Sequence, residues 1–309
     1  MKVSVAMATY NGANYIKEQL ASILNQTRAV DEVIICDDCS KDNTVVIVKE
    51  FIDRYQLQSK WRIEINEKNL GFGSNFNQAV TKTTGDIIFF CDQDDIWVED
   101  RIQTMTSIME ENQAILILGS EYEPFKSTRN AFKSSTRDLA KFKNNNSIEH
   151  LKLQAKTIFI GYLGCCMCIR RDFFYQIQPY WFEGWAHDEF VWKLALCLDG
   201  AYVYHGITIR RRLHSSNTSM GKMRDLLKRV KFLEDLLKSH EATLKFARDY
   251  QINENKIRLI ERNIISVKLR IGLLRDKKYL NIIRLCIKYS RYYHSQRSIP
   301  VELYMAIKG

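Results

Sequence analysis

Residues 87–97 read IIFFCDQDDIW, in which four large apolar residues and a cysteine are followed by three carboxylates in four positions. The apolar run is typical of a buried strand. Carboxylates delivered together to the end of such a strand repel one another unless a cation neutralises them. Asp92, Asp94 and Asp95 offer the oxygen ligands that Mg²⁺ and Mn²⁺ prefer, so the stretch predicts a divalent-metal site. The alternative is a solvated acidic turn that caps the next helix.

The residues before this stretch alternate short β-rich runs with helical stretches. The periodicity predicts strands at 3–8, 32–36, 61–66 and 86–91 and helices at 15–26, 43–55 and 75–83. This order predicts an α/β fold with a parallel sheet and helices on both faces. Farther along, the polar residues 120–150 are expected to form a surface loop or a mobile lid.

Ligands of such sheets bind at the carboxyl ends of the strands, so the residues that follow each strand are the first candidates for a site. A carboxylate after the second strand, such as Asp38, can accept from a nucleobase N–H or a ribose hydroxyl, and an aromatic such as Tyr10 can stack on a base. Asp38 equally suits a helix N-cap. The first strand is not followed by GxGxxG and the sequence has no P-loop, which argues against NAD binding and ATP-cleaving chemistry of those kinds.

Composition places the chain among ordinary folded proteins, since 46% of its 309 residues are hydrophobic and 27% are charged. No apolar stretch reaches the roughly 18 residues that span a bilayer, and the first residues show no signal peptide, so we expect a cytosolic protein. The eight cysteines are then expected as free thiols. The spacings of Cys36 with Cys39 and of the cysteines in 165–168 give only weak support for redox or metal use.

The net charge of +10 is concentrated in the last part of the chain. Residues 1–221 carry 25 basic and 27 acidic residues, whereas residues 222–309 carry 21 basic and 9 acidic ones. From residue 222 onward, apolar residues recur at i, i+3 and i+4 spacing, which predicts helices. We therefore expect an α/β domain at residues 1–221 and a basic helical subdomain at residues 222–309.

The basic excess predicts an anionic partner for the helical subdomain. An anionic membrane surface is favoured, and no nucleic-acid partner is expected, because the sequence has no helix-turn-helix, zinc-finger or RNP-type pattern. A solvated helical face is the alternative.

Four motifs in order resemble the signature of family 2 glycosyltransferases with the GT-A fold. They are Thr9-Tyr10-Asn11, Asp37-Asp38-Cys39-Ser40, Asn69-Leu70-Gly71 with Asn75, and Asp92-Gln93-Asp94-Asp95-Ile96-Trp97. The last motif is similar to that of the bacterial rhamnosyltransferase-like branch, and the resemblance covers roughly residues 1–220. It implies a GT-A (Rossmann-like) nucleotide-diphospho-sugar transferase domain with a helical C-terminal extension.

The resemblance also assigns residues to the donor and the metal. The expected nucleotide-binding residues are Thr9, Tyr10, Asn11, Asp38, Asn69, Asn75, Asp92, Arg211 and Arg212. The expected ligands of Mn²⁺ or Mg²⁺ are Asp94, Asp92 and His214, with Asp94 closest to the metal. The stretch 210–217 is similar to the family's Arg-x-His-x-x-Asn segment, which closes over the diphosphate, and arginine suits a dianionic leaving group. Cys39 departs from the pattern, because it stands where the family usually has Gly.

The stretch Trp185-Ala186-His187-Asp188-Glu189 matches the family's acceptor loop. By that resemblance Asp188 is the general base, while Trp185, His187 and Glu189 lie on the acceptor side. One carboxylate that takes the proton of the acceptor hydroxyl is what an inverting displacement requires. Asp188 also suits the start of the apolar helix that follows it.

These features together predict an inverting, metal-dependent glycosyltransferase. It is expected to be non-processive, because the Gln-x-x-Arg-Trp motif of processive synthases is missing. The leading donor is dTDP-rhamnose, and the acceptor is a lipid-linked saccharide of bacterial cell-surface polysaccharide synthesis at the cytoplasmic face of the membrane. The alternatives are a UDP-galactose or UDP-glucose transferase and a catalytically silent membrane-docked partner of another transferase, although the intact Asp92, Asp94 and Asp188 argue against silence. A homodimer is compatible with these sequence features.

Overall fold

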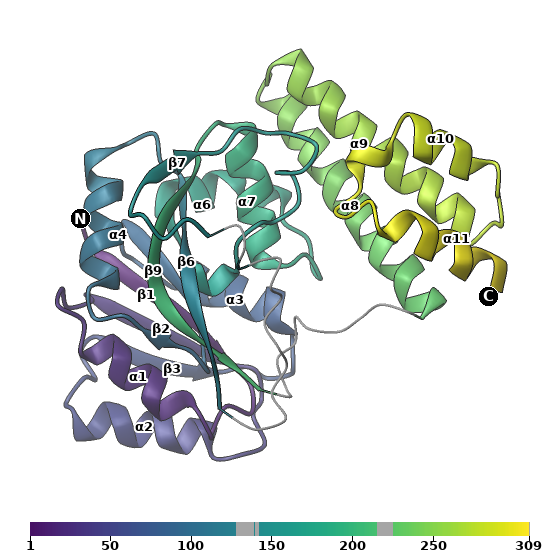
Figure 1. Cartoon of the computed structure of the whole chain (residues 1–309). Coiled ribbons are helices and arrows are strands. Elements are labelled where there is room, and N and C mark those ends of the chain that lie inside the picture. Colours follow the sequence, from purple (N-terminus) through teal and green to yellow (C-terminus); the bar gives the residue numbers. More distant parts are fainter. Residues whose placement is uncertain (128–138, 140–141, 215–224, 309) are drawn as a thin grey trace.

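A mixed sheet of nine strands forms the centre of the part of the chain that the computed structural model describes, residues 1–127, 139, 142–214 and 225–308 (Figure 1). The strands are β1 (Val3–Thr9), β2 (Glu32–Asp37), β3 (Trp61–Ile65), β4 (Ile87–Asp92), β5 (Ile96–Trp97), β6 (Ile117–Lys126), β7 (Ile148–His150), β8 (Met167–Arg170) and β9 (Ala201–Leu213). Their order is β3-β2-β1-β4-β8-β6-β9-β5, with β7 paired to β9. The β3-β2-β1-β4 half is parallel, and β8 runs antiparallel to both β4 and β6.

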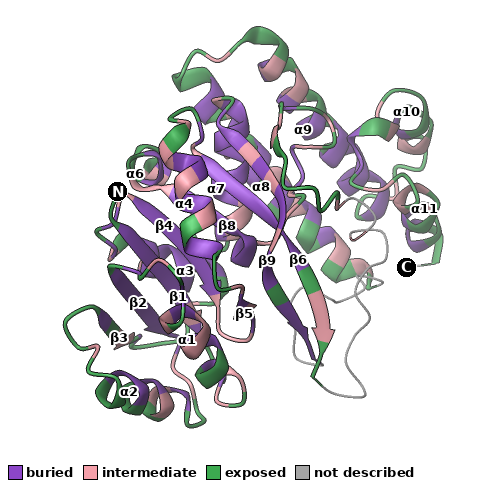
Figure 2. Cartoon of the chain, turned by 60° about the vertical axis from the view of Figure 1, so that its left-hand side comes forward, coloured by how far each residue is buried: buried purple, intermediate pink, exposed green. Residues whose placement is uncertain are grey.

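Helices cover both faces of the sheet. They are α1 (Ile16–Leu24), α2 (Thr44–Arg54), α3 (Phe72–Thr81), α4 (Arg101–Glu111), α6 (Arg171–Ile177) and α7 (His187–Cys197). Along β4, Phe89 packs in one apolar cluster with residues of α1, α2 and α4, whereas Phe90 packs in a second cluster with residues of α3, α6 and α7. Both clusters are buried (Figure 2). The alternation follows from the period of two along a strand, and it explains why the apolar run is unbroken.

The predicted α/β half is confirmed, with every expected strand and helix of the first 92 residues present to within a few positions. The prediction of a surface loop for residues 120–150 is confirmed at residues 142–147, which lie outside any strand or helix and are mostly exposed, but it is wrong at both ends. Residues 120–126 belong to β6, residues 148–150 form β7, and residues 128–138 and 140–141 lie outside the described residues.

Buried polar contacts explain why β6 looks like a loop in the sequence. Glu121 is completely buried within β6, and the Nδ1 atom of His205 lies 2.7 Å from its Oε1 atom. The backbone N–H groups of Lys143 and Asn144 donate to the same carboxylate at 2.7 and 2.9 Å. Because tertiary partners satisfy this charge, a polar stretch occupies the middle of the sheet.

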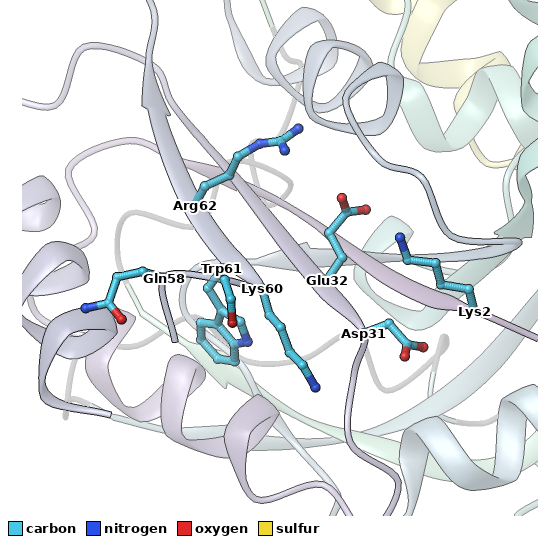
Figure 3. Close-up of a pocket in the computed structure, with 8 residues that line it drawn as sticks. Lys2, Asp31, Glu32, Gln58, Lys60, Trp61 and Arg62 are labelled. Carbon is cyan, nitrogen blue, oxygen red and sulfur yellow. The ribbon is translucent and has the colours of Figure 1, made fainter. Parts of the chain in front are cut away.

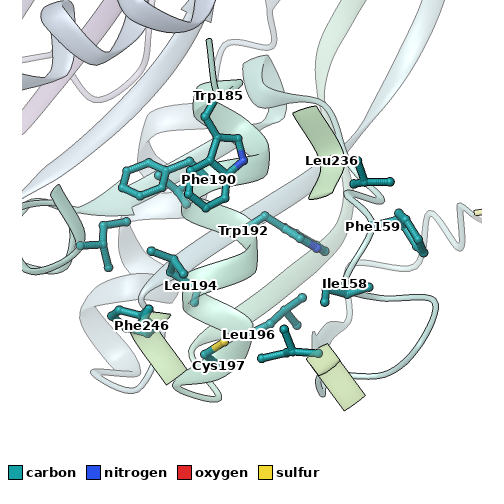
Figure 4. Close-up of a cluster of buried hydrophobic side chains, with 14 of the residues drawn as sticks. Ile158, Phe159, Trp185, Phe190, Trp192, Leu194, Leu196, Cys197, Leu236 and Phe246 are labelled. Atoms are coloured by element: carbon teal, nitrogen blue, oxygen red, sulfur yellow. The ribbon is translucent and has the colours of Figure 1, made fainter. Parts of the chain in front are cut away.

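The C-terminal region is helical, as predicted. It contains α8 (Leu226–Asp249), α9 (Glu254–Leu274), α10 (Asn281–Ile287) and α11 (Ser298–Lys308). Trp192 and Leu194 of α7 share one buried apolar cluster with Leu236 and Phe246 of α8 (Figure 4). The helical region is therefore packed on the sheet domain through α7. Within the described ranges, no helix combines the length and the apolar content that a bilayer span requires.

A buried ion triad joins three of these helices. Glu302 of α11 is completely buried, and its Oε1 atom lies 2.6 Å from guanidinium nitrogens of both Arg229 and Arg270. Burial raises the pKa of Glu302, but the guanidinium of Arg270 and then that of Arg229 outweigh burial and hold it below its ordinary value. Glu302 is therefore a charged group on which the packing of α8, α9 and α11 depends.

We predict that Glu302→Ala lowers the free energy of unfolding by about 3–5 kcal/mol, because it leaves two arginines without their buried counter-charge. Asp235→Ala is the control, since Asp235 pairs with Lys231 on the exposed face of α8 and its loss should cost less than about 0.5 kcal/mol. Urea unfolding followed by circular dichroism measures both. Equal effects of the two substitutions would contradict a structural role for the triad.

Candidate functional site

The carboxyl ends of β1, β2 and β4 meet at one edge of the sheet. The register places Ala8 opposite Asp92 and Thr9 opposite Asp37. The segments that follow these three strands are therefore brought together, as the parallel order predicts.

Amide side chains hold the segment that follows β1. The Gln93 side chain donates to the backbone carbonyl of Tyr10 at 2.9 Å and accepts from its N–H at 2.8 Å. The backbone N–H of Asn11 donates to Ser40 Oγ at 2.8 Å, and Asn11 Oδ1 accepts from the N–H of Lys41 at 2.7 Å. These bonds tie the first loop to the loops after β2 and β4, while the Tyr10 ring stays about half exposed at the edge.

The turn after β2 forms around Asp37. The Asp37 carboxylate accepts from the hydroxyl of Thr9 at 2.8 Å and from the backbone N–H and hydroxyl of Ser40 at 2.8 and 2.6 Å. Cys39 adopts a left-handed conformation with φ of 64°, which is the region that favours glycine. Cys39 thus takes the backbone conformation that glycine, the family's usual residue here, adopts readily. The Cys39 thiol donates to the backbone carbonyl of Asn66 at 2.9 Å.

Asp38 organises the loop between β3 and α3. Its carboxylate accepts from the backbone N–H groups of Leu70 at 2.7 Å and Gly71 at 2.9 Å, and the Asn69 side chain donates to the Asp38 carbonyl at 3.0 Å. Asn75 is buried beside them and donates to a backbone carbonyl of β2. The alternative role of Asp38 as a helix cap is wrong, because the next helix is preceded by Asn43. Asn66 donates to both Asp38 Oδ1 and Asn75 Oδ1 at 2.9 Å and so joins these residues in one network.

The acidic stretch places several ligand atoms at the end of β4. One ligand atom each from Asp92, Asp95 and Cys165 lie within 4.8 Å of one another. Burial, and then the charges of Asp94 and Asp95, raise the pKa of Asp92 well above its ordinary value. Burial, and then the charge of Asp94, raise the pKa of Asp95 to about 7. A cation at this position would relieve both, so the residues fit a divalent metal ion.

Cys165 reaches this cluster through strand pairing. It lies in the short 3₁₀ turn η1 (Gly164–Cys166) directly before β8, which pairs antiparallel with β4. The residues before an antiparallel strand lie beyond the carboxyl end of its neighbour. The cysteine cluster at 165–168 was the signal in the sequence, but spacing alone could not place it beside residues 92–95.

His214 and Arg212 contact the same acidic stretch. The Nε2 atom of His214 lies 2.6 Å from Asp94 Oδ2, and the His214 ring packs on Tyr15 with 4.7 Å between ring centroids. The Arg212 side chain donates to the backbone carbonyl of Asp94 at 2.9 Å, and its backbone N–H donates to the Asp95 carboxylate at 2.9 Å. Two of the three expected metal ligands, Asp94 and His214, are thus in direct contact.

Arg211 and Arg212 belong to the end of β9. The Arg212 guanidinium lies 2.5 Å from the carboxylate of Glu18 and packs over the Phe125 ring, while that of Arg211 packs over the Tyr122 ring. The sequence had not singled out Glu18, which lies on the predicted helix after β1. Residues 215–217 of the expected diphosphate segment lie outside the described residues.

Asp188 lies in the first turn of α7. One oxygen of its carboxylate accepts from the backbone N–H of Glu189 at 2.8 Å. Burial raises the pKa of Asp188 to about 6. Its Cβ packs against Gly164, the residue before Cys165 of the acidic cluster, and its charge contributes to the raised pKa of Asp92. A carboxylate with this pKa can accept a proton near neutral pH.

The other expected acceptor-side residues pack inside the protein. Trp185 is buried in the apolar core, and the Glu189 carboxylate lies 2.5 Å from the completely buried ammonium group of Lys193. The His187 ring stacks on Phe76 with 3.8 Å between ring centroids. Burial lowers the pKa of His187 to about 3, and neither ring nitrogen has a hydrogen-bond partner among the described residues. These three side chains are therefore held by contacts within the protein, and His187 packs beside Asp188 against Gly164.

A separate pocket lies at the other edge of the sheet. It has a volume of about 140 Å³, and its lining includes Lys2, Glu32 and Trp61 from the amino ends of β1, β2 and β3 (Figure 3). None of the predicted site residues lines it.

Residues 4–178 match the family model described as glycosyl transferase family 2. The chain is similar to the UDP-Glc:alpha-D-GlcNAc-diphosphoundecaprenol beta-1,3-glucosyltransferase WfgD of Escherichia coli, with 28% identity over 80% of this chain and 91% of the relative. It is also similar to the dTDP-rhamnosyl transferase RfbG of Shigella flexneri, with 38% identity over 35% of this chain and 38% of the relative.

Two solved structures share the fold. TarS 1–349 of S. aureus in complex with UDP-GlcNAc has a TM-score of 0.64 at 17% identity and matches 98% of this chain and 82% of that one. The mannosyltransferase PcManGT of Pyrobaculum calidifontis in complex with GDP-Man and Mn²⁺ has a TM-score of 0.58 at 14% identity and matches 99% of this chain and 87% of that one.

We predict that His187 makes the protein sensitive to mild acid. Its folded pKa lies below the unfolded value of 6.5, so stability is lost as pH falls below that value, by about 2 kcal/mol between pH 7 and pH 5. His187→Leu should remove this loss, measured as the difference in unfolding free energy between the two pH values. Trp185→Phe, a neighbouring core substitution without a titrating group, should leave the difference unchanged. A wild-type difference equal to that of His187→Leu would contradict the prediction.

Proposed function

Because the chain belongs to glycosyl transferase family 2 and has the GT-A fold, as its motifs predicted, we propose that it is an inverting, metal-dependent, non-processive glycosyltransferase. It moves one sugar from a nucleotide-diphosphate donor to a lipid-linked saccharide in bacterial cell-surface polysaccharide synthesis. The observation that carries the proposal is the position of Asp188, which packs against Gly164 directly before Cys165 of the cluster that Asp92, Asp95 and Cys165 form.

The loops after β1 and β2 are proposed to hold the donor nucleoside. The Tyr10 ring is available for stacking on a base, and Thr9 and Asn11 fix the loop that presents it. Asp38 acts on the Asn69 loop, because its carboxylate is bound to the backbone of that loop. Arg211 and Arg212 supply positive charge for the diphosphate.

Asp92, Asp94 and His214 are proposed to hold Mn²⁺ or Mg²⁺, with Asp95 beside them. The raised pKa of Asp92 supports a cation here, and the solved mannosyltransferase contains Mn²⁺. When bound, the metal ion neutralises the negative charge that the leaving diphosphate develops.

Asp188 is proposed to act on the acceptor. Its carboxylate takes the proton of the acceptor hydroxyl while that oxygen bonds to the anomeric carbon of the sugar. The bond from the anomeric carbon to the diphosphate oxygen breaks at the same time, and the configuration inverts. Burial suits Asp188 to this role, because a pKa of about 6 leaves it ionised at neutral pH and a better proton acceptor than an exposed carboxylate.

Two donors are supported by different observations. The DQDDIW motif and the similarity to RfbG favour dTDP-rhamnose. WfgD is named for the donor UDP-Glc, and its match covers most of this chain and most of WfgD, so it favours a UDP-hexose. The WfgD acceptor, a diphosphoundecaprenol-linked sugar, supports a lipid-linked acceptor for this chain. We place the enzyme at the cytoplasmic face of the membrane, with its basic C-terminal helices on the anionic surface.

We predict that Mn²⁺ with one nucleotide sugar raises the melting temperature, and that Asp94→Asn removes both this effect and turnover. A thermal-shift screen of dTDP-rhamnose, UDP-glucose and UDP-galactose with and without Mn²⁺ identifies the donor. Asp100→Asn is the control, because Asp100 is an exposed carboxylate just before α4. Full activity in EDTA would contradict the metal proposal, and stabilisation without turnover on any acceptor would favour the silent-partner alternative.

We predict that Asp188→Asn retains donor binding but loses roughly 10²–10⁴-fold in kcat, the usual contribution of a general base. In the wild type, kcat/KM should fall tenfold per pH unit below about pH 6, because the base is inactive when protonated. Asp172→Asn, at an exposed position of α6, serves as the control. Weaker donor affinity with unchanged kcat would assign Asp188 to another role.

A further inference from the structure

The last two helices expose large apolar side chains. The exposed fractions are 79% for Leu280, 53% for Ile283, 74% for Ile287, 58% for Tyr304 and 67% for Ile307. Leu280, Ile283 and Ile287 are spaced i, i+3 and i+7, so they share one face at the start and along the length of α10. Tyr304 and Ile307 are likewise neighbours on α11.

These side chains belong to adjacent segments. The ammonium group of Lys277 and the hydroxyl of Tyr279 both donate to the backbone carbonyl of Ala306, at 3.0 and 3.2 Å. This contact places the turn that carries Leu280 against the end of α11 that carries Ile307. Both views show α10 and α11 at the outer end of the helical bundle, away from the β3 edge of the sheet (Figures 1 and 2).

Basic residues neighbour the exposed apolar residues along the chain. Between residues 277 and 308 they are Lys277, Lys278, Arg284, Lys288, Arg291, Arg297 and Lys308, of which Lys278 pairs with the exposed Asp276 at 3.7 Å. The acidic residue in the same range is Glu302, which is buried against Arg229 and Arg270 and adds no charge to the surface. Arg284 and Lys288 each follow an exposed isoleucine directly. An apolar face bordered by positive charge matches a surface that is anionic outside and apolar beneath.

We propose that α10 and α11 insert this apolar face into the headgroup region of an anionic bilayer, with the basic side chains on the phosphates. The inference rests on the proposed function only in that a lipid-linked acceptor brings the enzyme to a membrane. A second copy of the chain fits the face less well, because a two-fold contact would set its basic residues against their own copies. The insertion differs from purely electrostatic docking, because burial of apolar groups persists when salt screens the charges.

The test is co-sedimentation of the full chain with vesicles of phosphatidylglycerol and phosphatidylcholine in equal parts, against phosphatidylcholine alone. The wild type should bind the acidic vesicles and remain partly bound at about 0.5 M NaCl. The variant Ile283→Gln/Ile287→Gln/Ile307→Gln should lower the partition coefficient at least about tenfold at both salt concentrations. Glutamine favours helix at least as well as isoleucine, so the helices are retained.

Two further variants separate the contributions. Arg284→Gln/Lys288→Gln should weaken binding at low salt and change it little at high salt, because only the screened part of the attraction is lost. Val46→Gln, at an exposed apolar position of α2 in the sheet domain, should bind as the wild type does. Cys286 is the one exposed thiol of the eight cysteines, all of which are described, and it lies between Ile283 and Ile287. An NBD label there should shift its emission to shorter wavelength on acidic vesicles.

Three results would overturn the proposal. The first is a wild type that stays in the supernatant at low salt, and the second is an isoleucine variant that binds as the wild type does. The third is a wild-type dimer in sedimentation equilibrium that this variant dissociates, which would assign the face to a second copy. Stabilisation by nucleotide sugar, measured on the same preparations, reports on the transferase proposal separately. If nucleotide sugar still stabilises a preparation that does not bind vesicles, only the membrane-insertion proposal is overturned.

Discussion

Repulsion between the carboxylates of the 92–95 stretch is the constraint around which the site is arranged. β4 carries these groups out of the apolar core, and the burial of Asp95 and partial burial of Asp92 and Asp94 limit the screening of their charges by water. The chain opposes the charge with groups from distant segments, namely the backbone N–H of Arg212, the ring of His214 and the charge of Arg211. The end of the long strand β9, with His214 directly after it, brings all three groups to the end of β4, so the mixed half of the sheet completes a site that begins in the parallel half.

The helix that carries Asp188 is fixed from its other side. The buried ammonium group of Lys193 contacts Glu189 at 2.5 Å and donates to Ser239 of α8 at 2.7 Å. A buried charge is tolerated only with such partners, so α7 can adopt few positions relative to the helical region. The C-terminal helices therefore support the orientation of Asp188 through α8.

Local periodicity predicted the parallel half of the sheet, because the apolar runs and amphipathic helices there are formed by neighbouring residues. The motifs also predicted the family and the fold, which are confirmed, while the roles of individual site residues stay predictions. Other features depend on distant partners. β6 has a polar sequence, and its buried Glu121 is bound by His205 from another strand, while Cys165 joins the cluster only through the pairing of β8 with β4. The placement of His187 was hidden for the same reason, since Phe76 on α3 provides the ring that covers it.

Charge along the chain and charge on the surface are different quantities in the C-terminal region. Arg229 and Arg270 are part of the basic excess of residues 222–309, yet both are held by the buried Glu302. Several other basic side chains pair with acids on the same helices, such as Lys231 with Asp235 and Lys245 with Asp249. The count of basic residues therefore overstates the attraction of α8 and α9 for an anion. It does not do so for α10 and α11, where Arg284 and Lys308 are exposed next to exposed apolar side chains.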